Sequence, residues 1–480
     1  MKITRRRFIG STLAIGAALT FPAPALIARG ANEKIRLGSI SCGGRARELL
    51  AEFTKNSEID VVALCDPDAK RRGAVAEKYG VSKTFADPRA LLEEKEIDAV
   101  IVATCNHWHC LAAVWAMEAG KDVYVEKPLA HNQFEGAQTV KAARKFGRVC
   151  QVGMQQRSDP MQAEIKKFLH EEKAIGKILK ARVNHYSVRK PIGKQTEPLE
   201  FPPEVDKNLW LGPAEDRPIF RNKLQYDWHW DWNTGNGEMG NWGVHVMDDM
   251  RNNLLLDHGP MPKAIMAGGA RVGYNDAGET PNVHFVYYET DLFPVVLGLS
   301  NLAIKSNPKS AGDHPGPGSG YIAYCEGGRL EGQRGHAAAF DADGKKIRDF
   351  NGDSGQPEHV RNFIDAVLAQ DASGLNAEVA VGNDSCGWCN LANIGVRAGR
   401  PYRKSDALAN DPADGLWTEQ ISEAEARMAE RGIDMEKEFR FTAHLAFDGT
   451  SGQFTGEGAD DANRFLRRTY RKGFEMPKFD

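Results

Sequence analysis

The chain has 480 residues, of which 26% are charged, and a formal net charge of −3. This length is enough for two or three domains with a large hydrophobic core. A net charge so close to zero, without long low-complexity tracts, argues against a nucleic-acid-binding surface, so we expect no nucleic-acid partner.

The N-terminus carries the pattern of a targeting segment. Arg5–Arg7 precede an uncharged run from Phe8 to Ala28, which contains the small residues of Ala23–Ala25. This pattern is typical of a twin-arginine export signal, and we assign residues 1–31 to it. A membrane anchor is the alternative, because the run is long enough to span a bilayer, but Pro22 and Pro24 favour the signal. We therefore expect a periplasmic protein without stable membrane insertion after cleavage.

Eight cysteines are spread along the chain, and Cys386 and Cys389 form a C-x-x-C pair in a predicted helix. A structural zinc site needs four ligands, and no second pair of ligands lies nearby in the sequence. A buried pair of thiols is the favoured interpretation, a disulfide comes second and a metal site last. We expect no metal cofactor.

Residues 32–153 alternate between apolar strands and helices, which predicts a doubly wound parallel sheet. The first strand, Ile35–Ile40, leads into a glycine-rich turn. The turn residues that could contact a dinucleotide are Ser41, Gly43, Gly44 and Arg45. Such a turn lets backbone N–H groups approach a pyrophosphate at a helix N-terminus. The motif is degenerate, because Ser41 stands where the first glycine is usual.

Asp66 follows the second predicted strand and lies at the distance expected for a carboxylate that binds the adenosine ribose hydroxyls. A carboxylate there repels a 2′-phosphate and so favours NAD, although Lys70 and Arg71 nearby leave NADP open. The alternative is that Asp66 caps a helix with Pro67 at its first position. An exported protein has no dependable supply of free dinucleotide, so we expect the cofactor to stay tightly bound.

The segment Asp122–Pro128 is predicted to be a buried strand that ends on Glu126, Lys127 and a proline. In an open α/β sheet, ligands bind at the carboxyl ends of the strands. The proline also makes a cis bond after Lys127 accessible. Together with the Thr104–His109 turn and Asp66, the order of these motifs resembles the glucose–fructose oxidoreductase / inositol dehydrogenase / MocA family. Cys105 replaces the proline that is usual in that family.

This resemblance implies a nicotinamide dinucleotide in the first domain. Thr104, Asn106 and His109 would border the cofactor, Glu126 would hold its ribose side, and Lys127 would contact the reacting hydroxyl. The neighbouring His107 is expected to be exposed or to cap the helix.

The resemblance also implies that residues 154–403 form an α+β domain with a large, open, mostly antiparallel sheet. One face of that sheet would support a homodimer or homotetramer. A strand ending at Tyr186 leads towards Arg189, and an aromatic and acidic stretch follows at Tyr226–Trp232. Aromatic faces and carboxylates suit a sugar, so these residues are candidates for substrate binding, with core packing as the alternative. The candidates are Tyr186, Arg189, Trp230 and Trp232.

A helix is predicted from Asn241 to about Leu256. Asn241, His245 and either Asp248 or Asp249 would share one face of it, because residues three or four apart are neighbours on a helix. An aspartate one turn away could orient His245, and both aspartates are candidates for substrate contact. In the family, this helix carries an aspartate four residues before the histidine, and the histidine and the lysine flank the reacting carbon; here Asn241 stands in place of that aspartate. Asn241 cannot take a proton, so the base would be His245 or Lys127.

Two enzymatic functions fit these motifs. The first is an NAD(P)-dependent oxidoreductase acting on a sugar or polyol hydroxyl, with Lys127, His245 and Asn241 as catalytic residues. The second is a glycoside hydrolase that oxidises the sugar transiently and needs no net redox partner. A sugar-binding protein without activity is the third reading. Residues 404–480 are a C-terminal extension whose basic cluster, Arg467–Lys472, is expected to be solvated surface.

Overall fold

The computed structural model describes residues 34–480, and the predicted export signal lies outside the described residues. Within residues 34–480, no helix has both the length and the hydrophobicity needed to cross a membrane. The described part forms one compact unit.

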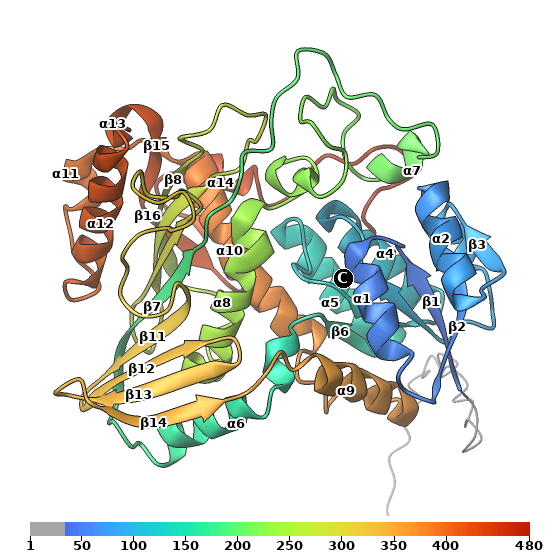
Figure 1. Ribbon diagram of the computed structural model, residues 1–480, viewed down its shortest axis with the longest axis horizontal. Helices are drawn as coiled ribbons and strands as arrows, with labels where there is room; N and C mark the ends of the chain where they lie inside the picture. Colours follow the sequence, from blue (N-terminus) through green and yellow to red (C-terminus); the bar gives the residue numbers. More distant parts are fainter. Residues whose placement is uncertain (1–33) are drawn as a thin grey trace, which may run out of the picture. The chain divides into compact units, whose positions relative to one another are not determined.

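A six-stranded parallel sheet forms the first domain (Figure 1), which confirms the predicted doubly wound fold. The strands lie in the order β3-β2-β1-β4-β5-β6. They are β1 Ile35–Ile40, β2 Ile59–Cys65, β3 Lys83–Phe85, β4 Ala99–Val102, β5 Asp122–Val125 and β6 Cys150–Val152. The helices between them are α1 Gly44–Phe53, α2 Ala69–Tyr79, α3 Pro88–Leu92, α4 Asn106–Glu118 and α5 Gln133–Phe146.

Both faces of this sheet are covered, which explains why β4 contains only apolar residues. Val100 and Val102 belong to one apolar cluster with residues of α4 and α5. Ala99 and Ile101 belong to another with residues of α1 and of α9, Gln356–Ala369. The chain thus returns to cover the first domain after it has built most of the second.

An eleven-stranded sheet forms the second domain, and it is mostly antiparallel as expected. Its order is β14-β13-β12-β11-β7-β10-β9-β8-β16-β15, with β17 paired to β16, and β7 and β10 are parallel. The strands up to β14 are β7 Ile178–Tyr186, β8 Ala264–Ala270, β9 Val283–Glu289, β10 Val295–Ser300, β11 Ser319–Cys325, β12 Gly328–Gln333, β13 His336–Asp341 and β14 Lys346–Asn351. The last three are β15 Arg400–Pro401, β16 Arg440–Asp448 and β17 Gln453–Thr455.

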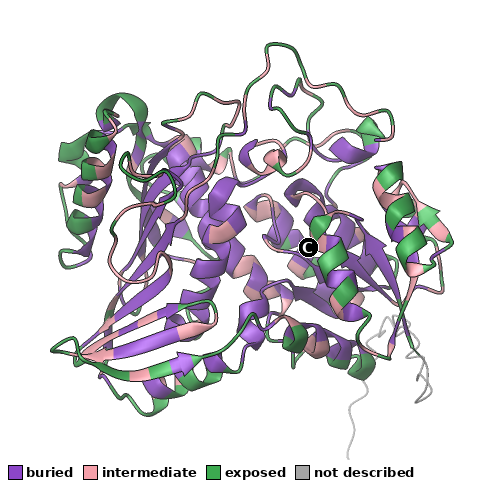
Figure 2. Cartoon of the chain, viewed as in Figure 1, coloured by how far each residue is buried: buried purple, intermediate pink, exposed green. Residues whose placement is uncertain are grey.

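Two helices join the domains. α8, Val244–Met250, packs on β7 and β11, and α10, Val379–Ala398, packs on α5, α8 and β8. Figure 2 shows both helices buried along most of their length. Shorter helices are α6 Met161–Lys166 and α7 Lys207–Leu211.

The C-terminal extension completes the second domain. It contains α11 Lys404–Ala407, α12 Leu416–Glu430, α13 Met435–Glu438 and α14 Ala459–Asn463. α12 packs on β9 and β10, and β16 pairs with β8. The last residues return to the first domain, where the ring of Phe474 lies 5.6 Å from that of Trp108. The extension therefore holds the two domains together.

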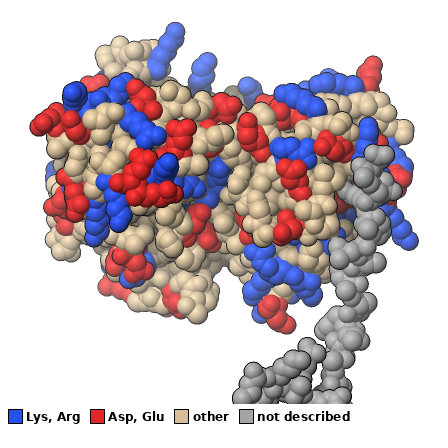
Figure 3. All heavy atoms as spheres, turned by 90° about the horizontal axis from the view of Figure 1, so that it is seen from below, with Lys and Arg blue, Asp and Glu red and all other residues tan. Residues whose placement is uncertain are grey.

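Acidic and basic side chains are interspersed on the face of the molecule shown in Figure 3. That face carries no broad basic surface. Cys386 and Cys389 are buried free thiols, and residues 34–480 contain no group of three or more metal-ligating side chains.

Candidate functional site

A cleft of about 520 Å³ opens at the carboxyl edge of the parallel sheet. Its walls come from the glycine-rich turn, the ends of β2, β4 and β5, and the irregular segment between β7 and α8. The predicted cofactor residues that line it are Ser41, Gly43, Gly44, Arg45, Asp66, Thr104, Asn106, His109, Glu126 and Lys127. The fold thus brings all ten to one place.

The glycine-rich turn has the shape of a phosphate-binding turn despite its sequence. Ser41 has a φ of 121°, a left-handed conformation that explains why glycine is usual there. Its Oγ accepts a hydrogen bond of 3.1 Å from the N–H of Gly43. No atom lies within 4 Å of where a Cβ of Gly44 would be, so the start of α1 is open to a ligand. These features fit a dinucleotide pyrophosphate.

Asp66 is buried next to this turn. Its carboxylate accepts hydrogen bonds from the N–H of Cys42, at 2.7 Å, and of Asp68, at 2.9 Å. Burial raises its pKa, against these hydrogen bonds. Asp68, not Asp66, caps α2, so the capping alternative for Asp66 is wrong. Asp66 instead ties the glycine-rich turn to β2 while lining the cleft.

Arg45 and Glu126 pair with each other across the cleft wall, with Nε and Oε1 2.7 Å apart. Arg45 also donates to Gln356 of α9 at 2.6 Å. Both side chains line the cleft, but in this structure they are hydrogen-bonded to other side chains of the protein.

The residues that follow β4 hold the site together. His109 is buried, and its ring nitrogens face the carbonyls of Pro128 at 2.7 Å and Thr104 at 3.1 Å. Asn106 donates to Asn236 of the second domain at 3.0 Å. His107, expected to be exposed or capping, is instead buried between the carbonyls of Thr234 and Trp210, because the second domain covers this turn.

Lys127 meets the second domain directly. The Lys127–Pro128 bond is cis, as the sequence suggested. The Lys127 Nζ donates to the backbone carbonyl of Asn241 at 2.8 Å. Burial lowers the pKa of Lys127 to about 8, although Glu126 and Glu238 oppose this shift. An amine with this pKa can exchange protons near neutral pH.

Glu238 is a site residue that sequence reasoning missed. It is fully buried, and it accepts hydrogen bonds from His185 at 2.9 Å, Arg189 at 2.8 Å and the side chain of Asn241 at 3.2 Å. Burial opposes its ionisation, but His185 and Arg189 lower its pKa to about 2. Its only signal in the sequence was its position one helical turn before Asn241.

His245 lies one turn after Asn241, beside a second residue that was missed, Arg334. The Arg334 Nη2 lies 3.4 Å from the Nδ1 of His245, and its guanidinium lies over the ring of Trp242. Burial and the charges of Lys127 and Arg334 hold the pKa of His245 well below its usual value. Arg334 comes from the turn between β12 and β13, so no local pattern could link it to His245.

The two predicted aspartates have different surroundings. Asp248 is buried in an ion pair with Arg157 at 2.8 Å and accepts from Ser385 at 2.6 Å, so it does not orient His245. Asp249 lies one turn beyond His245, and burial together with Asp248 raises its pKa to about 8, opposed by Arg334. Asp248 is therefore a structural residue, whereas Asp249 belongs to the same helix face as His245.

None of the six predicted substrate residues is among those that line the cleft, and three of them face other parts of the protein. The hydroxyl of Tyr186 faces Gln420, and its ring faces Arg427; both are residues of α12. Trp230 is buried, and its carbonyl accepts from Glu279. Trp232 lines a different cavity. Residues Asp227–Trp230 form a 3₁₀ turn rather than a strand. Alternate side chains therefore do not point in the same direction.

The residues of the Tyr226–Trp232 stretch that do line the cleft are Tyr226, Trp228 and His229. The rings of Trp228 and His229 stack with centroids 3.6 Å apart, and Tyr226 is 53% exposed. Arg189, the remaining predicted substrate residue, is held next to Asn241 through Glu238.

Residues 35–154 match a family model, GFO_IDH_MocA, described as "Oxidoreductase family, NAD-binding Rossmann fold". This stretch thus matches the NAD-binding Rossmann domain of the family that its motifs resemble.

Curated relatives match a quarter to two fifths of the chain. Inositol 2-dehydrogenase 4 of Saccharopolyspora erythraea is 30% identical over 185 residues, which are 38% of this chain and 54% of the relative. Inositol 2-dehydrogenase of Salmonella typhimurium is 33% identical over 133 residues, 27% of this chain and 39% of the relative. A glycosyl hydrolase family 109 protein of Stenotrophomonas maltophilia is 35% identical over 133 residues, 25% of this chain and 29% of the relative. The chain spans about half or less of each of these relatives.

Solved structures extend the similarity to both domains. The WlbA dehydrogenase from Bordetella pertussis, in complex with NADH and UDP-GlcNAcA, has a TM-score of 0.54 at 18% identity, covering 74% of this chain and 93% of that one. An oxidoreductase from Agrobacterium radiobacter, in complex with NAD+, L-tartaric acid and magnesium, has a TM-score of 0.53 at 16% identity, covering 75% and 95%. At these identities the likeness establishes the two-domain fold.

Proposed function

We propose that this chain is an NAD-dependent oxidoreductase of the glucose–fructose oxidoreductase / inositol dehydrogenase / MocA family. It would act on a hydroxyl of a carbohydrate or polyol while holding its cofactor tightly. The observation that carries the proposal is the contact of Lys127 with Asn241 at the sheet edge, one helical turn from His245. The inositol dehydrogenase relatives support the substrate class.

The cleft residues suit the cofactor. The open N-terminus of α1 at Gly44 would hold the pyrophosphate, and Asp66 would accept the hydroxyls of the adenosine ribose. When bound, NAD would supply the acceptor for the hydride of the oxidised carbon. The carboxylate of Asp66 favours NAD over NADP, because it repels a 2′-phosphate.

Lys127 would take the proton of the reacting hydroxyl. With a pKa of about 8, a substantial fraction of Lys127 is the neutral amine near physiological pH. Asn241 cannot act as a base, and the nearest carboxylate on its helix, Glu238, is engaged by His185 and Arg189. The substitution of the family's aspartate by Asn241 therefore leaves the lysine as the base.

His245 would donate a hydrogen bond to the substrate oxygen. A guanidinium can only donate, so the Nδ1 that faces Arg334 must accept, and the proton of the neutral imidazole lies on Nε2. Nε2–H can then bind the oxygen from which Lys127 takes the proton. Tyr226 and Trp228 would pack on the apolar face of a sugar ring.

The second candidate function is glycoside cleavage without net redox change, which the glycosyl hydrolase family 109 relative favours. The same base and hydrogen-bond donor would serve it, since the first step is also oxidation of a hydroxyl. Supplying one glycoside and no electron acceptor separates the two functions. Release of free sugar in amounts far above the enzyme concentration supports cleavage.

Two measurements test the leading function. Mass spectrometry of the denatured, purified protein should identify released NAD. A screen of sugars and polyols against the intact protein should then find one that changes the nicotinamide absorbance. A protein that neither carries nor binds a dinucleotide contradicts both enzymatic functions.

We also propose export by the twin-arginine route and assembly into a homo-oligomer. Replacement of Arg5–Arg7 by lysine should keep the protein in the cytoplasm on cell fractionation. Because α12 packs on β9 and β10, a shared interface would have to use β11–β14 of the same sheet. Light scattering after size-exclusion chromatography measures the oligomeric state.

A further inference from the structure

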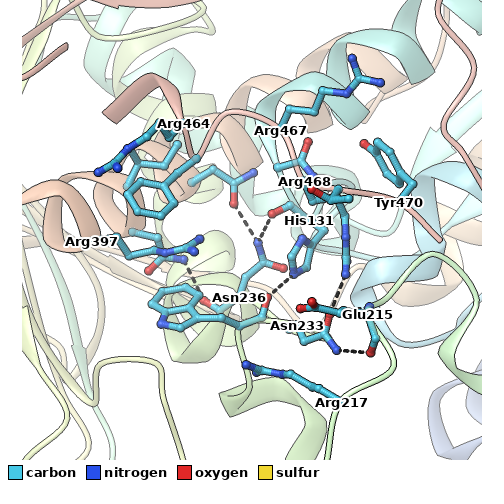
Figure 4. Close-up of a pocket in the computed structure, with 18 of the residues that line it drawn as sticks. His131, Glu215, Arg217, Asn233, Asn236, Arg397, Arg464, Arg467, Arg468 and Tyr470 are labelled. Atoms are coloured by element: carbon cyan, nitrogen blue, oxygen red, sulfur yellow. Dashed lines mark hydrogen bonds between the residues drawn. The ribbon is translucent and has the colours of Figure 1, made fainter. Parts of the chain in front are cut away.

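A second cavity, of about 420 Å³, shares no lining residue with the cleft. It lies where the start of α5, the loop around residues 215–236, α10 and the C-terminal tail meet (Figure 4). Six of its lining residues are arginines: Arg217, Arg397, Arg464, Arg467, Arg468 and Arg471. Glu215 is the one acidic lining residue within the described part of the chain. The basic cluster of the tail, predicted to be solvated surface, thus forms one wall of a cavity.

Arg397 contacts two aromatic rings but has no polar partner among the described residues. Its guanidinium lies 4.8 Å from the ring centre of Trp232 and 4.0 Å from that of Phe465. Within residues 34–480 it makes no hydrogen bond or ion pair. Burial lowers the pKa of Arg397 to about 10, and the carboxylate of Glu279 offsets only part of this shift. Its N–H groups are therefore available to bind an anion.

Arg468 is the second arginine whose N–H groups are not all hydrogen-bonded. One of its nitrogens, Nη2, donates to Asn233 at 2.8 Å, but Nε and Nη1 are buried with no acceptor among the described residues. Glu135 and Glu215 act on its charge from nearby, yet neither is hydrogen-bonded to it. The two unpaired buried donors of Arg468 are costly, which indicates a missing acceptor. The Nδ1 of His131 is also buried without a partner, and it is an acceptor because Nε2 donates to the carbonyl of Trp232.

The other four arginines already have partners. Arg217 pairs with Glu279, Arg464 with Asp461, and Arg471 with the carbonyl of Asn208. Arg467 lies over the ring of Phe134. In Figure 4 the guanidinium groups of Arg464 and Arg467 point away from the cavity, whereas Arg397 and Arg468 approach it from different sides.

We propose that this cavity binds a small organic anion whose carboxylate or phosphate group is held by Arg397 and Arg468. Both are planar donors that match the oxygens of such groups. The volume is in the range of small-molecule sites and exceeds the need of a single inorganic ion. The buried Oδ1 of Asn393 has no donor, so it would accept a hydrogen bond from a hydroxyl of the ligand. A sugar acid or a sugar phosphate has both kinds of group.

Isothermal titration of the full chain with D-glucuronate, glucose 6-phosphate, inorganic phosphate and uncharged glucose tests this proposal. We expect at least one of the two organic anions to bind more tightly than inorganic phosphate, and glucose not to bind at the cavity. Arg397→Gln should weaken that binding about tenfold or more, since it removes a charged donor. Arg464→Gln, the same change on a side chain that points away, should bind as the wild type does.

Thermal unfolding of each variant checks that it folds. It is measured without organic anion, in a chloride buffer whose ionic strength equals that of the titrations. Arg397→Lys, which keeps the charge but not the planar fork, should bind more tightly than Arg397→Gln. The proposal is overturned if no organic anion binds, if inorganic phosphate binds best, or if the affinity is equal in the wild type and Arg397→Gln.

Discussion

Single residues in this site have their chemistry changed by burial and by their neighbours. Lys127 lies among Glu126, Arg45 and Asn241, and burial lowers the pKa of its ammonium to about 8. His245 stays neutral because burial, and then the charges of Lys127 and Arg334, lower its pKa. Lys127, and Asp249 one turn beyond His245, are thus the groups whose pKa of about 8 lies in the working pH range.

Replacing Lys127 with Met should lower kcat by about 10²–10⁴-fold, because the base is lost. The amount of bound dinucleotide should stay close to that of the wild type. In the wild type, kcat/KM for oxidation should rise with pH through about 8, as the amine loses its proton. Lys190→Met changes an exposed lysine and should have little effect. Steady-state rates between pH 6 and 10 would contradict the assignment if Lys127→Met kept this pH dependence.

His245→Gln should lower kcat less than His245→Ala, because glutamine keeps a hydrogen-bond donor. Neither change should move the rise of kcat/KM near pH 8, since His245 is neutral throughout that range. The comparison of both pH profiles with the wild type checks this. Loss of the rise in either variant would make His245 the base instead.

Asp66→Asn should raise the share of NADP in the dinucleotide released from the purified protein by about tenfold or more. The carboxylate that repels a 2′-phosphate is removed, whereas the amide oxygen can still accept from Cys42. Mass spectrometry of the released cofactor gives the ratio. An unchanged ratio would show that Asp66 does not face the ribose.

At the scale of elements, one helical segment arranges the second half of the site. α8 is continued at both ends by π-helical turns, Met239–Gly243 and Arg251–Leu255. Asn241, His245 and Asp249 follow one another at intervals of four residues along it. Glu238 anchors its start, through Arg189 and His185, to β7 and the segment after it.

Glu238→Gln should destabilise the fold at neutral pH and change the pH dependence of stability. The folded-state pKa of Glu238 is depressed from 4.5 to about 2. The ionised carboxylate therefore contributes about 3 kcal/mol above pH 4.5, and this is lost as the pH falls towards 2. Urea unfolding at pH 7 and pH 3 should show the gap between wild type and variant narrowing at pH 3. A gap that is equal at both values would contradict the assignment.

At the scale of the whole molecule, the C-terminal tail connects parts that are far apart in the sequence. Phe474 lies against Trp108 and Trp115 of α4, and Phe479 against Phe146 of α5. Arg468 reaches the loop at Asn233. The tail thus contacts both the first domain and the loop that leads to α8.

Phe474→Ala should lower the free energy of unfolding by about 3–5 kcal/mol, because it leaves a cavity in a packed aromatic cluster. Phe474 is 4% exposed, whereas Phe220 is 39% exposed and offers the same substitution as a control. Chemical denaturation should show a much smaller loss for Phe220→Ala. Equal losses would mean that the tail does not support the fold.

The sequence by itself determined the doubly wound sheet and the NAD-binding class of the first domain, and it predicted that Lys127 and His245 belong to one site. These depend on short-range signals: strands of apolar residues, turns with special residues, and charged residues at strand ends. Tertiary structure alone decided that Tyr186, Trp232 and Asp248 face other partners and that Glu238 and Arg334 join the site. Those contacts link residues distant in the chain, as Arg468 with Asn233 also does, and no local periodicity encodes which of them meet.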